Sequence, residues 1–259
     1  MAKAKAKRRT TAKSRKTKLR TDVAPAVGPA TVPTRWVKFV VGLFLLPPAW
    51  VLTQTFFTAF ARATIHQGFW ATEEFWFFGL GLLIWLCAFF ALPRPMWIYV
   101  FGHELTHAVW VLLHGGKVSQ FHVTPRGGHV LSDRINTLIA LAPYFFPIYS
   151  LLVIVIYGAA SLFWDMTPFR PLLYMLIGAT WAFHITFTLW MIPRGQSDLT
   201  YGGTFYSLTI IYLLNLAILS VFLIIASPGI TLVGFARELL TNAVEFTALV
   251  TRALHTLKF

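Results

Sequence analysis

Long apolar runs are the feature that most constrains the fold of this chain. A helix needs about 20 predominantly apolar residues to cross the hydrocarbon core of a bilayer, and the 259-residue sequence contains several such runs. Only 12% of the residues are charged and 57% are apolar, whereas a soluble domain carries about 25% charged residues. The composition therefore predicts an integral, multi-pass membrane protein with an all-α fold.

About six segments have the length and composition of transmembrane helices. They are residues 36–60, 75–92, 95–113, 137–160, 171–192 and 205–226. The first contains Pro47-Pro48, which should kink it, because proline removes a backbone hydrogen bond and clashes with the preceding turn. After Pro228, polar residues recur at three- and four-residue spacing, which indicates an amphipathic helix that lies on the membrane interface or packs on the bundle.

The N-terminal tail carries most of the excess positive charge. Ten of the 22 Lys and Arg residues, from Lys3 to Arg20, fall in the first 20 positions of a chain with formal net charge +13. The tail has too few large apolar residues to fold alone, so it is expected to be disordered. Basic residues beside a span favour the cytoplasmic side and attract anionic lipid. We therefore predict a cytoplasmic N-terminus, anionic lipid as a partner of the tail, and no specific nucleic acid.

These observations divide the chain into three parts. Residues 1–34 are the disordered basic tail, 35–226 the transmembrane domain, and 227–259 the amphipathic C-terminal helix. The single cysteine, Cys87, allows neither an internal disulfide nor a cysteine zinc cluster. A metal site in this chain would therefore use histidine and carboxylate.

The third apolar run contains the pentad His103-Glu104-Leu105-Thr106-His107. On a helix, the two histidines stand one turn apart on one face and can bind one Zn²⁺, while Glu104 lies beside them as a general base. Burying a carboxylate and two imidazoles in a membrane costs roughly 2.5–3.5 kcal/mol for a charged group. Such residues normally have a partner and a function, so the pentad predicts a zinc centre.

Zinc enzymes usually take three protein ligands and leave one position for water. The pentad supplies two. The residues that could supply the third are Asp198, His184, Asp133 and His129. The pentad lies near the middle of its apolar run and so near the middle of the membrane, a depth that His184 inside the fifth run would share. Asp198 follows that run, and it can reach the same depth only if the chain turns back after Pro193.

A β-hairpin is expected directly after the pentad helix. Residues 118–124 alternate in polarity, as in a strand, and 125–128 have the composition of a turn. Residues 129–131 would then form the second strand, which runs back along the first. An exposed edge of this hairpin could bind an extended peptide by strand addition. Val118, Gln120 and His129 are the residues that we expect to contact such a strand.

The order of these features resembles the site-2 protease family of intramembrane zinc metallopeptidases. The shared features are a Gly-His-Glu-x-x-His-Ala helix, a Gly-Gly turn with a short hairpin, a proline-containing span and a further span that ends in an Asp; together they cover about residues 95–200. The resemblance implies that His103, His107 and Asp198 bind zinc. It also implies that Glu104 is the general base, and that zinc-activated water hydrolyses peptide bonds of a membrane-embedded protein substrate.

Two other functions are compatible with the sequence. A catalytically inactive membrane scaffold would share the fold but would have no need of a buried Glu104. A di-iron membrane oxidase would use several histidine boxes, whereas only His103 and His107, among eight histidines, have such spacing. The sequence therefore favours a zinc metalloendopeptidase.

Overall fold

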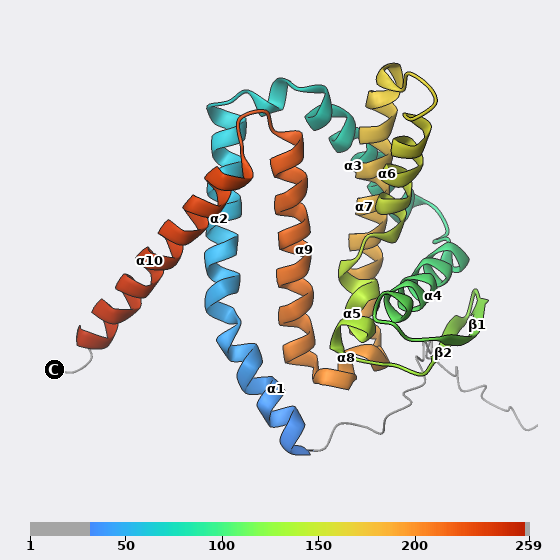
Figure 1. Cartoon of the computed structure of the whole chain (residues 1–259), viewed down its shortest axis with the longest axis horizontal. Helices are drawn as coiled ribbons and strands as arrows, with labels where there is room; N and C mark the ends of the chain where they lie inside the picture. The colour runs from blue at the N-terminus through green and yellow to red at the C-terminus, as the bar shows by residue number, and fades with distance from the viewer. Residues whose placement is uncertain (1–31, 257–259) are drawn as a thin grey trace, which may run out of the picture.

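The computed structural model describes residues 32–256. These residues form helices and one two-stranded antiparallel sheet (Figure 1), so the predicted helical fold with a short hairpin is confirmed. The predicted disordered tail lies outside the described residues, apart from its last three positions, where the first helix begins. The last three residues of the predicted C-terminal helix also lie outside them.

The elements follow one another from the basic end of the chain. The first half contains α1 (Val32–Phe44), α2 (Leu46–Ile65), η1 (Phe69–Ala71), α3 (Glu73–Ala91), α4 (Met96–Leu113), β1 (Val118–Thr124) and β2 (Gly127–Ser132). The second half contains α5 (Thr137–Phe145), α6 (Ile148–Ala160), η2 (Thr167–Phe169), α7 (Arg170–Met191), η3 (Ile192–Arg194), α8 (Ser197–Gly202), α9 (Thr204–Ala226) and α10 (Leu232–Thr256).

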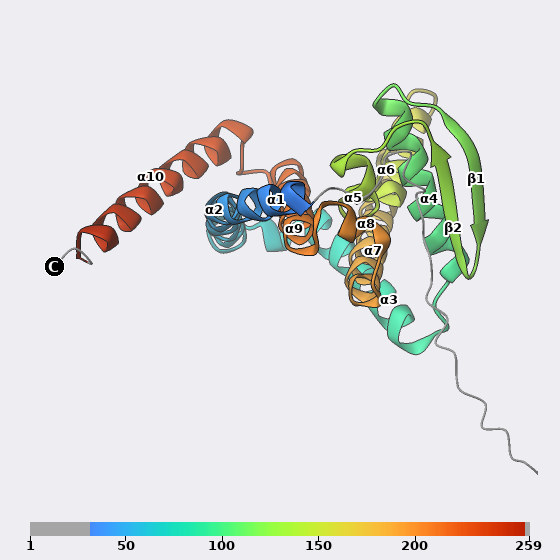
Figure 2. The same cartoon turned by 90° about the horizontal axis from the view of Figure 1, so that it is seen from below.

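Four helical segments are long and apolar enough to cross a membrane. They are Arg35–Ile65, Glu73–Ala91, Thr167–Arg194 and Thr204–Ala226, and a fifth is added if α5 and α6 form one broken span. These segments are consistent with the predicted membrane protein. The pentad helix α4 is not among them, and it lies across the direction of α2, α7 and α9, which Figure 2 shows end-on. The count of six spans therefore stays a prediction.

Prolines divide two of the predicted segments. The first breaks at Leu45, and α2 then begins with Pro47 in its first turn, where a missing N–H costs nothing. The segment predicted at 137–160 is two helices that meet at an angle of 74°. Phe146 between them is extended, because the residue before a proline, here Pro147, is disfavoured in the α conformation.

The helices form two groups that meet at one end. Helices α1, α2, α9 and α10 pack together, as do α3, α6 and α7, while α5 and α8 contact α9 at the end where α4 and the hairpin also lie (Figure 1). Helices α3 and α7 pack closely at two glycines that have no Cβ to keep the backbones apart. A Cβ on Gly81 would lie 1.9 Å from the Met175 carbonyl oxygen, and a Cβ on Gly178 would lie 2.1 Å from the Phe78 carbonyl oxygen.

The C-terminal helix α10 packs on the bundle through its first half only. Phe235 is buried, Glu238 forms an ion pair with Arg62, and the Asn242 amide donates a hydrogen bond to Thr55 Oγ1 at 2.9 Å. Its second half extends away from α2 (Figure 1). Contact of this half with the membrane interface stays a prediction.

Candidate metal centre

Helix α4 supplies three side chains of the centre. His103 and His107 are one turn apart on the face that packs on α5 and the hairpin, and both side chains are buried. Glu104, between them in sequence, is 0% exposed. The spacing that predicted a shared helix face is therefore realised, and the polar face of α4 is turned into the protein.

Asp198 reaches the same place from α8. Helix α7 ends at Met191, and the short helix η3 and Gly195 then turn the chain back into the bundle. Gly195 has φ = +77°, a left-handed conformation that glycine adopts without steric cost. As a result the Asp198 carboxylate is buried beside both histidines.

The ligand atoms of these three residues have the spacing of a metal site. The Nε2 atoms of His103 and His107 are 3.2 Å apart, and Asp198 Oδ2 lies 3.3 Å from the first and 3.6 Å from the second. Ligands held about 2.0–2.1 Å from a tetrahedral zinc ion would lie about 3.3–3.4 Å from one another. His103, His107 and Asp198 are therefore positioned to hold a metal ion.

Hydrogen bonds orient each ligand toward this point. The Ile139 carbonyl accepts a hydrogen bond from His107 Nδ1 at 2.9 Å, which leaves Nε2 as the atom with a free lone pair. The Tyr99 hydroxyl lies 3.3 Å from His103 Nδ1, and the Tyr144 hydroxyl donates to Asp198 Oδ2 at 2.9 Å. Metal-binding histidines and carboxylates characteristically have such outer contacts, which fix tautomer and orientation.

The β-hairpin covers Glu104. A Cβ on Gly128 would lie 2.6 Å from Glu104 Cγ and 3.0 Å from its Oε1, so the backbone of β2 touches the carboxylate side chain directly. Only glycine allows this approach. The general-base candidate is therefore held between its own helix and one strand.

The other residues predicted for the third ligand position lie elsewhere. Among the described residues, the group able to hold a metal ion comprises His103, His107 and Asp198 and does not include His184, which lines a neighbouring cavity. The Asp133 carboxylate accepts a hydrogen bond from the Lys117 backbone N–H at 2.6 Å. His129 lies opposite His122 in the hairpin, with the two rings tilted and their centroids 5.3 Å apart.

The hairpin residues predicted to contact a substrate strand do not all face α4. Phe121, which pairs with Val130, packs on Phe101 of α4. Side chains alternate along a strand, so Gln120 and His129 point to the opposite face of the hairpin. Val118 lies at the start of β1, before a register shift. Any contact of Gln120 or His129 with a peptide near Glu104 would therefore have to use backbone atoms.

Sequence reasoning missed Tyr99, Tyr144 and Gly128. Tyr99 precedes His103 by one helical turn, so the same spacing that linked the two histidines could have found it. Tyr144 and Gly128 come from distant segments and carry no sequence signal for contact with the centre. Their roles depend on how α5 and β2 dock on α4.

In chemical terms, the centre combines two imidazole nitrogens, one carboxylate and an adjacent second carboxylate. Two imidazoles with one carboxylate make a ligand set that zinc uses in hydrolases.

Comparison of the chain with protein-family models, curated proteins and solved structures finds no match. The geometry of the centre is therefore the basis for its functional interpretation.

Proposed function

We propose that the chain is an intramembrane zinc metallopeptidase of the site-2 protease type. The observation that supports this most directly is the convergence of His103, His107 and Asp198 beside Glu104, in the order expected for that family. One helix provides the pentad, and a distant short helix adds the carboxylate. A structural role alone would not require four buried ionisable groups at one point of an apolar bundle.

Zinc is the metal that best fits these ligands. The donor atoms are two imidazole nitrogens and one carboxylate oxygen, and such a site leaves one position open in catalytic zinc centres. When bound, zinc supplies Lewis acidity for the substrate carbonyl and for water. The Tyr144 and Ile139 contacts hold Asp198 and His107 in the orientation that binding requires.

Glu104 performs the proton transfers in this proposal. Its carboxylate accepts a proton from the attacking water and then gives it to the leaving amine, which is the task of a general base followed by a general acid. Burial between α4 and Gly128 keeps bulk water away from the carboxylate. The same burial fixes the position from which the proton is transferred.

The proposed substrate is a membrane-embedded segment of a protein. The centre lies among helices of which several are long and apolar enough to span a bilayer, so a substrate would reach it from the lipid. A helix shields its own carbonyl groups, and the segment must therefore be unwound before attack. Strand addition to the hairpin would hold an unwound segment next to Glu104.

A di-iron oxidase has less support. Such a site needs ligands for two ions, and within residues 32–256 three ionisable ligands gather only at the centre described above. His114, His122 and His129 take part in other contacts, with Trp110 or with one another.

The role of Glu104 can be tested with Glu104→Gln. The amide keeps the shape of the side chain but cannot accept the proton, so turnover of a membrane-embedded substrate should fall by about 10²–10⁴-fold. Zinc content should stay unchanged, because the three ligands are intact. Undiminished cleavage would reject the role, and loss of zinc would make Glu104 a ligand instead.

A further inference from the structure

Two arginine side chains gather around one tryptophan where α3 and α7 end. The guanidinium carbons of Arg94 and Arg194 lie 5.0 Å and 3.6 Å from the centre of the Trp190 ring. Helices α3 and α7 start together, since Glu74 pairs with Arg170, and each of the two arginines follows the last residue of one helix by three positions. The pair is therefore built from two chain segments that are distant in the sequence.

These two arginines have no acidic partner among residues 32–256. In this part of the chain, the carboxylates that pair with arginine pair with Arg62 and Arg170. Each guanidinium group has five N–H donors, and the described residues accept one donor of this pair, which Arg194 gives to the Trp190 carbonyl oxygen. The side chains of Arg94 and Arg194 are both exposed. The pair thus presents two uncompensated positive charges, and most of its donors, to the surroundings of the protein.

Large apolar side chains are exposed beside the pair. Phe90 and Leu92, on the chain segment before Arg94, are 78% and 62% exposed. The two segments that end here, Glu73–Ala91 and Thr167–Arg194, are long and apolar enough to cross a membrane. Tryptophan and arginine at the end of a span characteristically lie at the level of the lipid headgroups. In a membrane, the pair is therefore placed where phosphate groups and acyl chains meet.

We infer that Arg94 and Arg194 form a binding site for the phosphate group of an anionic phospholipid. The planar fork of a guanidinium group matches the oxygen atoms of a phosphate, and Trp190 holds both forks at one place through cation–π contacts. Two uncompensated positive charges favour a headgroup with a net negative charge, whereas a choline headgroup brings a positive charge of its own. The exposed apolar side chains beside the pair would contact the acyl chains, which a free phosphate ion lacks.

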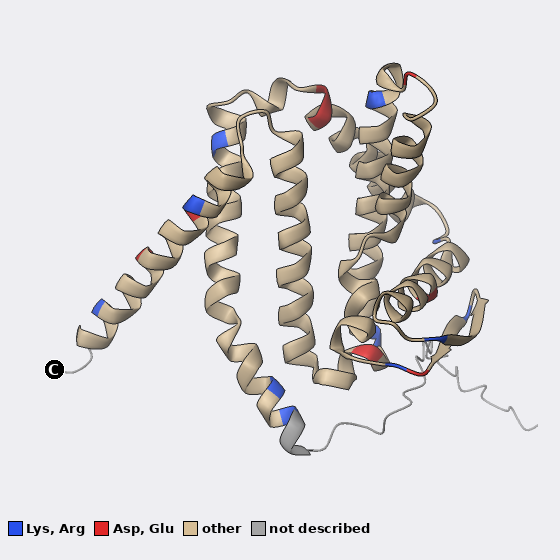
Figure 3. Ribbon diagram, viewed as in Figure 1, with Lys and Arg blue, Asp and Glu red and all other residues tan. Residues whose placement is uncertain are grey.

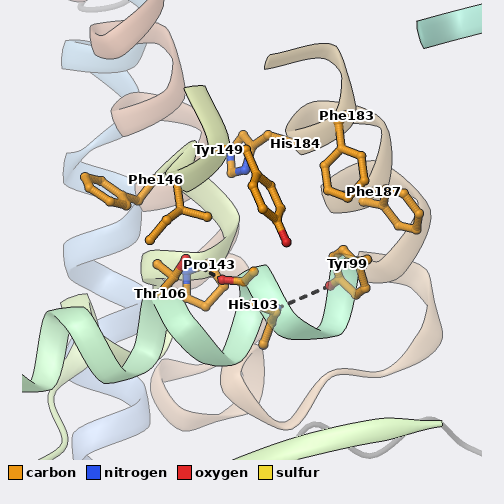
Figure 4. A pocket seen from close by; sticks show the side chains of 11 residues that line it. Tyr99, His103, Thr106, Pro143, Phe146, Tyr149, Phe183, His184 and Phe187 are labelled. Carbon is orange, nitrogen blue, oxygen red and sulfur yellow. Dashed lines mark hydrogen bonds between the residues drawn. The ribbon is translucent and has the colours of Figure 1, made fainter. Parts of the chain in front are cut away.

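The site is separate from the metal centre but is connected to it through aromatic rings. The Trp190 ring packs edge to face on Phe187, with centroids 6.0 Å apart, and Phe187 stacks on Tyr99 with centroids 4.6 Å apart. The Tyr99 hydroxyl in turn lies 3.3 Å from His103 Nδ1 (Figure 4). The side chains of Trp190, Phe187 and Tyr99 therefore stand between a bound headgroup and the nearest ligand of the centre along this path.

Lipid binding by the full-length protein tests the site. The inference goes beyond the proposed function and holds or fails independently of it, because binding is measured without substrate or turnover. Protein in a nonionic detergent is titrated with phosphatidylglycerol or with phosphatidylcholine of the same acyl chains, and the bound lipid is counted by native mass spectrometry. Phosphatidylglycerol should bind about tenfold more tightly than phosphatidylcholine. An equal concentration of inorganic phosphate should leave the bound phosphatidylglycerol in place.

Variants assign the preference to the two arginines. Arg94→Gln and Arg194→Gln should each weaken phosphatidylglycerol binding about tenfold, because each change removes charge-assisted hydrogen bonds to the phosphate. The double variant Arg94→Lys/Arg194→Lys should bind with intermediate affinity, since it keeps both charges but loses the guanidinium forks. The basic N-terminal tail is the same in every variant, so differences between variants report on the arginine pair alone.

Arg170→Gln is the matched control. The Arg170 guanidinium carbon also lies over an aromatic ring, at 5.8 Å from the centre of Tyr174, but this arginine is paired with Glu74. The variant loses the same charge as the single glutamine variants of the site, and it should bind phosphatidylglycerol as the wild type does.

Three results would overturn the inference. Unchanged phosphatidylglycerol affinity in both Arg94→Gln and Arg194→Gln would remove these residues from any lipid site. An equal loss of affinity in Arg170→Gln would mean that the lipid responds to net charge only. Displacement of phosphatidylglycerol by an equal concentration of inorganic phosphate would make the pair a site for soluble anions instead of lipid.

Discussion

His107 makes contacts through both ring nitrogens. Nδ1 bonds to the Ile139 carbonyl, and Nε2 faces His103 and Asp198. A buried imidazole fixed in this way has little freedom to turn away, so the ligand is oriented before a metal binds. Asp198 is held in the same manner by Tyr144. At this scale, the centre is a set of side chains whose orientations are determined by their neighbours.

Gly128 should be essential for the position of Glu104. In Gly128→Ala, the new Cβ would lie 2.6 Å from Glu104 Cγ and 2.6 Å from the His122 carbonyl oxygen, so the hairpin or the carboxylate must move. A shift of about 1 Å can cost on the order of 10²-fold in rate. Turnover measurements should show this loss with zinc content retained. Gly158→Ala, which meets no atom within 4 Å, is the control, and equal activity of both variants would contradict the contact.

The sequence predicts some of these residues and not others. His103, Glu104 and His107 follow from helical spacing. Asp198 is implied only by the resemblance to the site-2 protease family, since the depth of the pentad favours His184. It requires a turn after Pro193, and Gly195 makes that turn. The contact of Tyr144 with Asp198 joins residues 54 positions apart. Nothing in a local pattern indicates such a contact, because it depends on the docking of whole helices.

At the scale of elements, chain breaks position the centre. The hairpin was predicted by its alternation and turn composition, and it is confirmed with strands Val118–Thr124 and Gly127–Ser132. The division of 137–160 into α5 and α6 was not predicted, because two prolines within an apolar run are also compatible with a kinked span. Because of the bend, α5 contacts α4, α8 and α9. Ile139 and Tyr144 of α5 therefore lie within hydrogen-bonding distance of His107 and Asp198.

The contact of α3 with α7 should depend on its two glycines. Gly81→Ala would place a Cβ 1.9 Å from a backbone oxygen of α7, and backbone cannot move aside as a side chain can. We expect the free energy of unfolding to fall by about 1–3 kcal/mol, as measured by denaturant unfolding in detergent micelles. The control is Gly79→Ala on the same helix, which meets no atom within 4 Å. This change should be neutral or stabilise the helix slightly, and equal losses in both variants would contradict close packing at Gly81.

At the scale of the whole molecule, the centre lies at the end of the bundle where α1 begins. Helix α4, the hairpin and α8 all occupy this end (Figure 1). Basic residues of α1, of the hairpin and its flanking segments lie here as well: Arg35, Lys38, Lys117, Arg126 and Arg134 (Figure 3). Basic residues near span ends favour the cytoplasmic side. The cytoplasmic location of the N-terminus stays a prediction, and if it holds, the centre lies on the cytoplasmic side as well.

Cysteine labelling tests this orientation. In a Cys87→Ala background, Arg126→Cys places a thiol in the hairpin turn, and Asp165→Cys places one in the connection from α6 to α7 at the opposite end (Figure 1). A membrane-impermeant maleimide added to intact cells should label the second cysteine and reach the first only after the membrane is opened. Labelling in the reverse order would place the centre on the outer side.

The metal content of the purified protein tests the central claim most directly. Full-length protein in detergent should contain about one zinc ion per chain by elemental analysis. Asp198→Ala should lose this zinc, because the carboxylate oxygen 3.3 Å from His103 Nε2 is removed, whereas His184→Ala should retain it. Wild-type zinc content in Asp198→Ala, or loss of zinc in His184→Ala instead, would contradict a centre built from His103, His107 and Asp198.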